Sequence, residues 1–150
     1  MLIGLASDHA GWRLKEFIKG KLKEWGYQVE DFGCKDEKSV DYPDYAWKVI
    51  EEIRKGNLER GILFCGTGIG MSIVANKGRG IRAAVCWDEV TARLSRTHND
   101  ANVLCLGGRV LKPLEAEKIV KIWLETECEG GRHLRRLKKI EKIERSMRDG

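Results

Sequence analysis

The alternation of short apolar runs with amphipathic segments is the feature that most limits how this chain can fold. Five runs are expected to be strands: Leu2–Ala6, Tyr27–Phe32, Gly61–Cys65, Ile81–Cys86 and Asn102–Leu106. Between them, apolar residues recur at helical spacing, as in Leu14, Ile18 and Leu22. Strands that alternate with helices favour a mostly parallel sheet covered by helices on both faces. We therefore expect an α/β fold with a five-stranded, doubly wound sheet.

The end of the chain adds a helix to this pattern. Its apolar positions are Leu134, Leu137, Ile140, Ile143 and Met147, at steps of three or four residues. We expect this C-terminal helix to lie against the body or against a partner chain, because its apolar face drifts around the helix. The 150 residues contain no linker, repeat or low-complexity stretch, so residues 1–150 are predicted to form a single domain.

The charge distribution bears on the possible partners. The formal net charge is +5, but residues 132–150 hold eight of the 28 Lys and Arg side chains and only three of the 23 acids, so the rest is balanced. A basic field over the whole molecule, as in a nucleic-acid or membrane-surface binder, is excluded. No apolar run approaches the ~20 residues of a membrane span, and the N-terminus turns polar too early for a signal peptide. We expect a cytoplasmic protein.

The five cysteines are widely spaced and include no C-x-x-C pair, which argues against a zinc cage or a disulfide framework. Cys86 and Cys105 lie within predicted strands and are interpreted as core residues. Cys65 ends its strand directly before a glycine-rich loop and a predicted helix. The positive end of a helix favours a thiolate, so Cys65 can act as a base or nucleophile, although an inert buried thiol is equally compatible with its position.

The glycine-rich loop, Cys65-Gly66-Thr67-Gly68-Ile69-Gly70-Met71-Ser72, carries the densest functional signal. Its glycines let successive backbone N–H groups point into one concavity, which suits a phosphate or a developing oxyanion. A tight turn without a ligand is the simpler alternative. A nucleotide-binding site is a second and more specific alternative, because Asp88 ends the next predicted strand, where an acid that binds the ribose is expected. The spacing is nevertheless G-x-G-x-G, not the dinucleotide fingerprint, and no phosphate-loop lysine follows.

Other candidates are histidines and arginines. His9 follows Asp8 at the end of the first strand, where this pair can bind a ligand or cap a helix that begins near Ala10. His98 ends a helical run among polar neighbours. Arg132 and Arg136 are four residues apart, so on one helix face they can meet a single anion, although a solvated basic face is the simpler interpretation.

Seven segments of this sequence, taken in order, resemble those of the type B ribose 5-phosphate isomerase family, which also includes galactose 6-phosphate and allose 6-phosphate isomerases. They are Ser-Asp-His-Ala-Gly, Asp-Tyr-Pro, the glycine-rich loop, Ala-Asn-Lys, Gly-Ile-Arg-Ala, Ser-Arg-Thr-His-Asn-Asp-Ala-Asn and Glu-Gly-Gly-Arg-His. The resemblance covers nearly the whole chain. It implies a Rossmann-like α/β/α homodimer, or a dimer of dimers, whose active site is shared between subunits, and an aldose–ketose isomerase of carbohydrate metabolism that needs no metal or cofactor.

The resemblance also implies roles for individual residues. Cys65 is expected to be the base that moves a proton between C1 and C2, and His98 the donor that opens the furanose ring. Thr67 is expected to bond the thiolate or an enediolate oxygen. The residues expected to bind sugar and phosphate are Asp8, His9, Gly66, Thr67, Gly68, Ile69, Gly70, Asn99, Arg109, Arg132 and Arg136. A family subgroup uses a glutamate base on the next helix, but that position is Met71 here.

These residues support interconversion of ribose 5-phosphate and ribulose 5-phosphate through an enediolate. A six-carbon sugar phosphate isomerase is the alternative within the family. Two alternatives come from other classes of protein. One is a nucleotide-binding regulatory module on the same fold, and the other is a protein whose C-terminal arm binds nucleic acid. We expect neither, and we expect no membrane partner.

Overall fold

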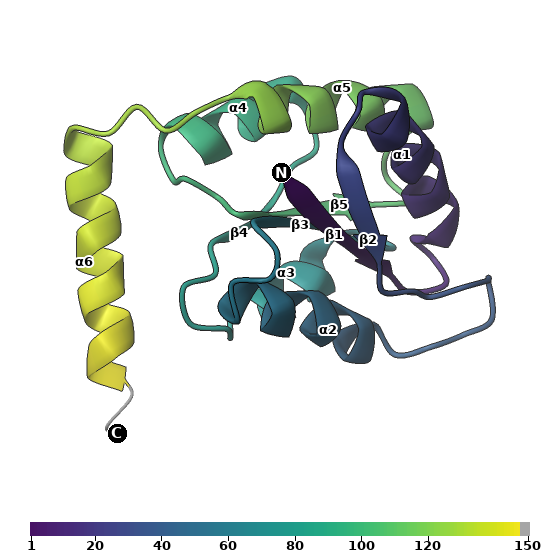
Figure 1. Cartoon of the computed structure of the whole chain (residues 1–150), viewed down its shortest axis with the longest axis horizontal. Helices are drawn as coiled ribbons and strands as arrows, with labels where there is room; N and C mark the ends of the chain where they lie inside the picture. The colour runs from purple at the N-terminus through teal and green to yellow at the C-terminus, as the bar shows by residue number, and fades with distance from the viewer. Residues whose placement is uncertain (148–150) are drawn as a thin grey trace.

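The computed structural model describes residues 1–147 and confirms the α/β architecture (Figure 1). The five strands are β1 (Leu2–Ser7), β2 (Gln28–Asp31), β3 (Arg60–Cys65), β4 (Ala83–Val85) and β5 (Val103–Gly107). They form one sheet in the order β2-β1-β3-β5-β4, and every pairing is parallel. Strands β2 and β4 are shorter than the predicted Tyr27–Phe32 and Ile81–Cys86. At their starts, the Tyr27 and Ile81 N–H groups bond to the preceding segment and not to a neighbouring strand, whereas at their ends the Phe32 and Cys86 N–H groups still donate to β1 and β5.

Six helices complete the chain: α1 (Trp12–Glu24), α2 (Tyr42–Arg54), α3 (Ile69–Ala75), α4 (Glu89–Thr97), α5 (Pro113–Glu125) and α6 (Arg132–Ser146). Helices α1, α4 and α5 cover one face of the sheet, and α2 and α3 cover the other (Figure 1). Pro43 and Pro113 occupy the first turns of α2 and α5, where a missing N–H costs no hydrogen bond.

Two cores fill the spaces between these layers. The core beneath α1, α4 and α5 includes Leu5, Phe64 and Trp123, and the core beneath α2 and α3 includes Leu63 and Met71. Cys86 and Cys105 are buried, as predicted for core residues, and burial raises the pKa of both thiols. These two thiols are therefore poor nucleophiles.

Helix α6 lies apart from the sheet, at the edge where the strands begin (Figure 1). The side chain of Leu137 is buried against the body, whereas Ile140, Ile143 and Met147 are exposed. The Glu144 carboxylate accepts a hydrogen bond from the Gly80 N–H at 3.1 Å. The predicted helix is confirmed, and most of its apolar face is uncovered in a single chain. Within residues 1–147, we find no helix with the length and apolar character needed to span a membrane.

An ion pair between the buried Lys15 and the partly exposed Asp31 secures the segment that follows β2. The Lys15 ammonium, 1% exposed, lies 2.7 Å from the Asp31 carboxylate and donates to the Cys34 carbonyl. Burial alone would raise the pKa of Asp31, but hydrogen bonds from Lys15, Lys19 and the Gly33 N–H outweigh it and lower that pKa. The Gly33 carbonyl in turn accepts from the Ser7 N–H, at the end of β1. The pair thus supports the strand end that carries Asp8.

Replacing Asp31 by Asn should destabilise the protein by about 2 kcal/mol at pH 7, because the buried Lys15 ammonium is then left with only the longer carboxylate contact, to Glu16 at 3.4 Å. A carboxylate with a lowered pKa stabilises the fold above ~pH 4 and loses that contribution as the pH falls. The variant should therefore also show a flatter loss of stability in acid. Urea unfolding at several pH values measures both effects. Glu30→Gln, on the same strand and exposed, should change neither; an Asp31→Asn variant as stable as this control would contradict the prediction.

Candidate active site

Three loops meet at the carboxyl edge of the sheet, after β1, β3 and β5. The Gly108 N–H donates to the Cys65 carbonyl at 2.7 Å, and the Arg109 N–H donates to the Gly66 carbonyl at 3.0 Å. The Asp8 N–H donates to the Phe64 carbonyl at 3.1 Å. Ligands of parallel α/β proteins bind at this edge. The loops predicted from the sequence to carry the chemistry are thus joined by their own backbones.

Glycine is required at two points of this junction. Gly68 has a φ of +85°, and a Cβ there would lie 3.1 Å from the backbone of Leu106. A Cβ on Gly107 would fall 2.8 Å from the Thr67 backbone. The glycine-rich loop therefore packs directly on the last strand and leads into α3. The Thr67 side chain, which is exposed, accepts a hydrogen bond from the Ile69 N–H at 3.2 Å.

Cys65 lies beneath this loop as the last residue of β3. Its side chain is 5% exposed, and its Sγ accepts a hydrogen bond from the Gly68 N–H at 3.1 Å. The thiol thus differs from its buried neighbours Cys86 and Cys105 in having a backbone donor from the glycine-rich loop, at the start of α3.

Asp8 and His9 are held in place by hydrogen bonds to the backbone. The Asp8 carboxylate accepts from the Ala10 and Gly11 N–H groups at 2.9 and 3.0 Å. The helix starts at Trp12, not near Ala10 as expected, so Asp8 secures the turn before the helix and does not cap the helix itself. The His9 Nδ1 accepts from the Val40 N–H at 3.2 Å. A neutral imidazole that accepts at Nδ1 carries its proton on Nε2, which can then donate to a ligand.

A cavity of about 370 Å³ opens beside His9 at this edge. It is lined by His9, Ala10, Arg13, Leu14, Glu37, Gly108 and Arg109. Arg13 is paired with Glu37, whereas the exposed Arg109 side chain extends over Gly66. The larger cavity of about 480 Å³ lies at the opposite edge, between α6 and the end of α3. The smaller one is the better candidate because it adjoins the loop of Cys65.

Tyr42 is a residue of this edge that was not singled out from the sequence. A Cβ on Gly70 would lie 2.6 Å from the Tyr42 ring, so the half-exposed ring covers the glycine-rich loop. In the sequence, Tyr42 belongs to the Asp-Tyr-Pro segment of the family resemblance, which assigned it no role. The aromatic ring gives the loop an apolar wall near Gly70.

The remaining predicted site residues lie at the other edge of the sheet. His98 directly follows the last residue of α4. This helix runs back from the carboxyl edge of the sheet to the amino edge, where β5 begins. The Asn102 carbonyl accepts from the Gly61 N–H at the start of β3. Asn99, which is exposed, lines a cavity against Leu137 of α6. His98 and Asn99 are thus level with the beginning of β3, not with Cys65 at its end.

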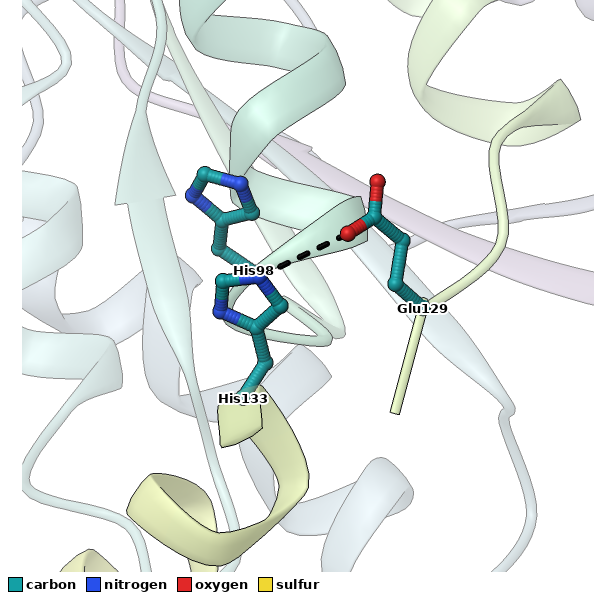
Figure 2. Close-up of side chains that lie close together, drawn as sticks. All are labelled: His98, Glu129 and His133. Atoms are coloured by element: carbon teal, nitrogen blue, oxygen red, sulfur yellow. Dashed lines mark ion pairs between the residues drawn. The ribbon is translucent and has the colours of Figure 1, made fainter. Parts of the chain in front are cut away.

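His98 is part of a compact cluster with His133 and Glu129 (Figure 2). The two imidazole rings are stacked, with centroids 4.1 Å apart and planes 14° apart. The Glu129 carboxylate lies 3.5 Å from Nε2 of His133. These three side chains are the one group within residues 1–147 whose ligand atoms approach as a metal site would require. In the stacked arrangement, however, the nitrogen lone pairs lie in parallel planes and do not converge on one ion.

Arg132 and Arg136 extend this cluster along the first turns of α6, and both are exposed. The predicted helix start at Arg132 is confirmed, so the two guanidinium groups lie one turn apart. Arg109, which was expected to join them, lies at the carboxyl edge in the same chain. One chain therefore does not bring these three arginines together.

The predicted site is thus divided between two ends of one molecule. Cys65, Thr67, Asp8, His9 and Arg109 lie at the carboxyl edge, and His98, Asn99, Arg132 and Arg136 lie at the amino edge. The length of β3 alone separates these edges by about 16 Å. A reaction that uses both groups in one step needs a second chain that brings its amino-edge group to the carboxyl edge of the first.

Asp88, the acid that raised the nucleotide alternative, has a structural role. Its carboxylate caps α4 by accepting from the Thr91 N–H at 2.7 Å, and the backbone hydrogen bond from Thr91 lowers its pKa. A carboxylate engaged in this way is a poor partner for a ribose hydroxyl. The geometry gives the nucleotide alternative no support at this residue.

Comparison with known proteins identifies the family of this chain. The model of the family described as Ribose/Galactose Isomerase matches residues 3–140. Ribose-5-phosphate isomerase B of Escherichia coli is 46% identical over 142 residues, which cover 95% of each chain. A putative sugar phosphate isomerase of Bacillus subtilis is 49% identical over 145 residues, covering 96% of this chain and 97% of that protein.

Solved structures are also similar. Ribose-5-phosphate isomerase B of Clostridium thermocellum superposes with a TM-score of 0.96 at 52% identity, covering 98% of this chain and 99% of that one. A ribose 5-phosphate isomerase of Thermotoga maritima gives a TM-score of 0.92 at 52% identity, covering 94% and 97%. The sequence motifs, the parallel sheet and these matches lead to one conclusion: the chain belongs to the ribose/galactose isomerase family.

Proposed function

We propose that this protein interconverts ribose 5-phosphate and ribulose 5-phosphate through an enediolate, in a site built from two copies of the chain. The observation that carries the proposal is the Cys65 thiol at the end of β3, 3.1 Å from the Gly68 N–H and directly under a loop of backbone donors. Relatives of nearly the same length are named ribose-5-phosphate isomerase B, and this supports the five-carbon substrate.

Ring opening comes first, because ribose 5-phosphate rests as a furanose. In the proposed mechanism, His98 of one copy donates a proton to the ring oxygen while the hydroxyl on C1 loses its proton to solvent, which leaves the open aldehyde. Histidine suits this step because its protonation changes near neutral pH. Asn99, from the same segment, binds a sugar hydroxyl.

Proton transfer follows at the carboxyl edge of the other copy. The Cys65 thiolate takes the proton from C2, and negative charge develops on the oxygen of C1. A proton passes from the C2 hydroxyl to that oxygen, and the same thiol returns its proton to C1, which leaves the ketone at C2. The backbone N–H groups of the loop other than those of Gly68 and Ile69, which already donate to Cys65 Sγ and Thr67 Oγ1, hold the developing charge. One such donor is commonly worth ~3 kcal/mol. Thr67 bonds the thiolate or the enediolate oxygen.

The phosphate lies between cations from both copies. Arg109 and the Nε2–H of His9 bind it from the copy that supplies Cys65, and Arg132 and Arg136 bind it from the copy that supplies His98. Guanidinium groups match phosphate oxygens with paired hydrogen bonds. The uncovered apolar face of α6 is consistent with a partner at this end of the molecule.

Substrate choice tests the proposal directly. We expect kcat/KM to be highest for ribose 5-phosphate when it is compared with allose 6-phosphate and galactose 6-phosphate. A higher value for either six-carbon substrate would assign the chain to the other branch of its family. Binding of an adenine nucleotide without any proton exchange on sugar phosphates would contradict an isomerase altogether.

Arg132→Ala and Arg136→Ala should each raise KM about 10- to 100-fold, since a hydrogen bond to a charged group contributes ~1.5–3 kcal/mol. The value of kcat should change little, because the phosphate is bound equally in the ground and transition states. Lys138→Ala and Lys142→Ala, on the same helix, serve as charge-matched controls with unchanged KM. If all four variants raised KM alike, the two arginines would contribute only to a general basic field.

His98→Asn should separate ring opening from proton transfer. Ribulose 5-phosphate has no free hydroxyl on C5 and stays open, so exchange of its C1 protons with solvent needs the base but not the ring opener. We expect the variant to lose at least about 100-fold in turnover of ribose 5-phosphate while C1 exchange is kept. NMR detection of both reactions checks this. Equal losses in the two would contradict a ring-opening role.

A further inference from the structure

His133 packs against His98 in a way that the reaction outlined above does not use. Its side chain is 7% exposed, and its ring covers one face of the His98 imidazole at a centroid distance of 4.1 Å (Figure 2). The two residues come from α6 and from the end of α4, 35 positions apart in the chain. Nothing in the sequence spacing alone places these rings together.

The segment between α5 and α6 fixes this contact. The Arg96 side chain donates to the Thr126 carbonyl at 3.0 Å, and the Glu129 N–H donates to the Thr97 carbonyl at 3.0 Å. Both bonds tie the segment to the last turn of α4, directly before His98. The start of α6 is therefore held on α4, and His133 is delivered to the His98 ring by a backbone that is already anchored.

The charges around His133 favour its neutral form. Burial lowers its pKa, and so do the neighbouring His98, Arg132 and Arg136, while Glu129 acts in the opposite direction. The result is a pKa below the ordinary value, so the ring is uncharged at pH 7. A neutral ring can lie flat on His98 when His98 carries a proton, whereas a second imidazolium would repel it.

We propose that His133 is a positioning residue that holds the His98 imidazole, through ring stacking, in the orientation needed for ring opening. The inference rests on the proposed role of His98. His98 follows the end of a helix and is half-buried, so its ring otherwise has few fixed neighbours. Proton transfer needs its donor within hydrogen-bond reach of the ring oxygen, and a misplacement of about 1 Å can cost about 100-fold in rate.

Three variants separate stacking from a merely structural role. His133→Leu removes the aromatic ring, and His133→Phe keeps a flat ring without a titratable group. Arg135→Ala changes an exposed residue on the same turn of α6 and is the matched control. Each is measured as the full-length protein for turnover of ribose 5-phosphate, for KM and for C1 proton exchange of ribulose 5-phosphate. The NMR shifts of the His98 ring protons report stacking independently of activity, through the ring current.

We expect His133→Leu to lower turnover of ribose 5-phosphate about 10- to 100-fold with C1 exchange and KM little changed. His133→Phe should restore most of the lost turnover. The upfield shift of the His98 ring protons should be lost in the Leu variant and kept in the Phe variant.

Several results would overturn the inference. Equal loss of both reactions, or a raised KM, in His133→Leu would mean that His133 serves only to anchor α6 and its arginines. Failure of Phe to rescue, with the ring-current shift preserved, would mean that stacking is not what His98 requires. The ratio of ribose 5-phosphate turnover to C1 proton exchange tests the two residues separately. If His98→Asn leaves this ratio at the wild-type value, the proposed role of His98 is wrong. If His98→Asn lowers the ratio but His133→Leu does not, only the proposed role of His133 is wrong.

Discussion

Replacing Cys65 by Ala is expected to lower kcat for ribose 5-phosphate by about 1,000-fold or more, because a positioned base contributes on the order of 10² to 10⁴ and nothing else in the loop takes its place. The thiol lies 3.1 Å from the Gly68 N–H at the end of β3, and the other side chains of the glycine-rich loop are not bases. Steady-state kinetics on the purified variant measure the effect.

Substrate binding should survive this change. The phosphate and hydroxyl groups are bound by other residues, so the dissociation constant of ribose 5-phosphate, measured by calorimetry, should stay within about threefold of the wild-type value. The C1 proton exchange of ribulose 5-phosphate should disappear together with turnover. Loss of exchange distinguishes this variant from His98→Asn, in which exchange is kept.

Cys105→Ala is the matched control. Cys105 is fully buried on the neighbouring strand, and burial raises the pKa of its thiol. We expect this variant to keep its activity and to lose only a little stability. A Cys65→Ala enzyme that retains a tenth of wild-type turnover would show that Cys65 is not the base.

Much of the carboxyl edge could be predicted from the sequence, because its signals are local. An apolar run followed by Gly66, Gly68 and Gly70 implies a strand, a tight loop and a helix start, and all three are present. The positive φ of Gly68 and the close approach of Gly107 to Thr67 explain why these two positions require glycine. The core positions of Cys86 and Cys105 followed from their place inside strands in the same way.

The division of the site between two edges could not be read from motifs. It depends on the direction in which α4 returns across the sheet, and so on the parallel pairing of β3 with β5. Where the strand boundaries were wrong, as at Tyr27 and Ile81, the backbone N–H bonds to the preceding segment and not to a neighbouring strand. Apolar character marks burial and does not by itself mark hydrogen bonding to a neighbouring strand.

His133 and Tyr42 were missed for a related reason. His133 meets His98 only because the segment from Thr126 to Glu129 is bonded to the end of α4, a contact between positions far apart in the chain. One signal was available: His133 and Leu137 are four residues apart, and both are buried on α6. Tyr42 approaches Gly70 through the packing of α2 beside α3, which no spacing in the sequence reveals.

The central claim is that each active site takes Cys65 from one chain and His98 from another, and mixing two inactive variants tests it most directly. Cys65→Ala and His98→Asn chains are unfolded together, refolded as a mixture and assayed for turnover of ribose 5-phosphate. In a mixed dimer, one site carries both substitutions and the other carries neither. Random pairing in dimers therefore restores about a quarter of the wild-type sites.

The recovered activity should rise with the product of the two chain fractions, and each variant refolded alone should stay inactive. The account predicts about a quarter of wild-type turnover at equal amounts of the two chains. Turnover that stays at the level of the separate variants, while native electrophoresis shows that mixed dimers have formed, would contradict it.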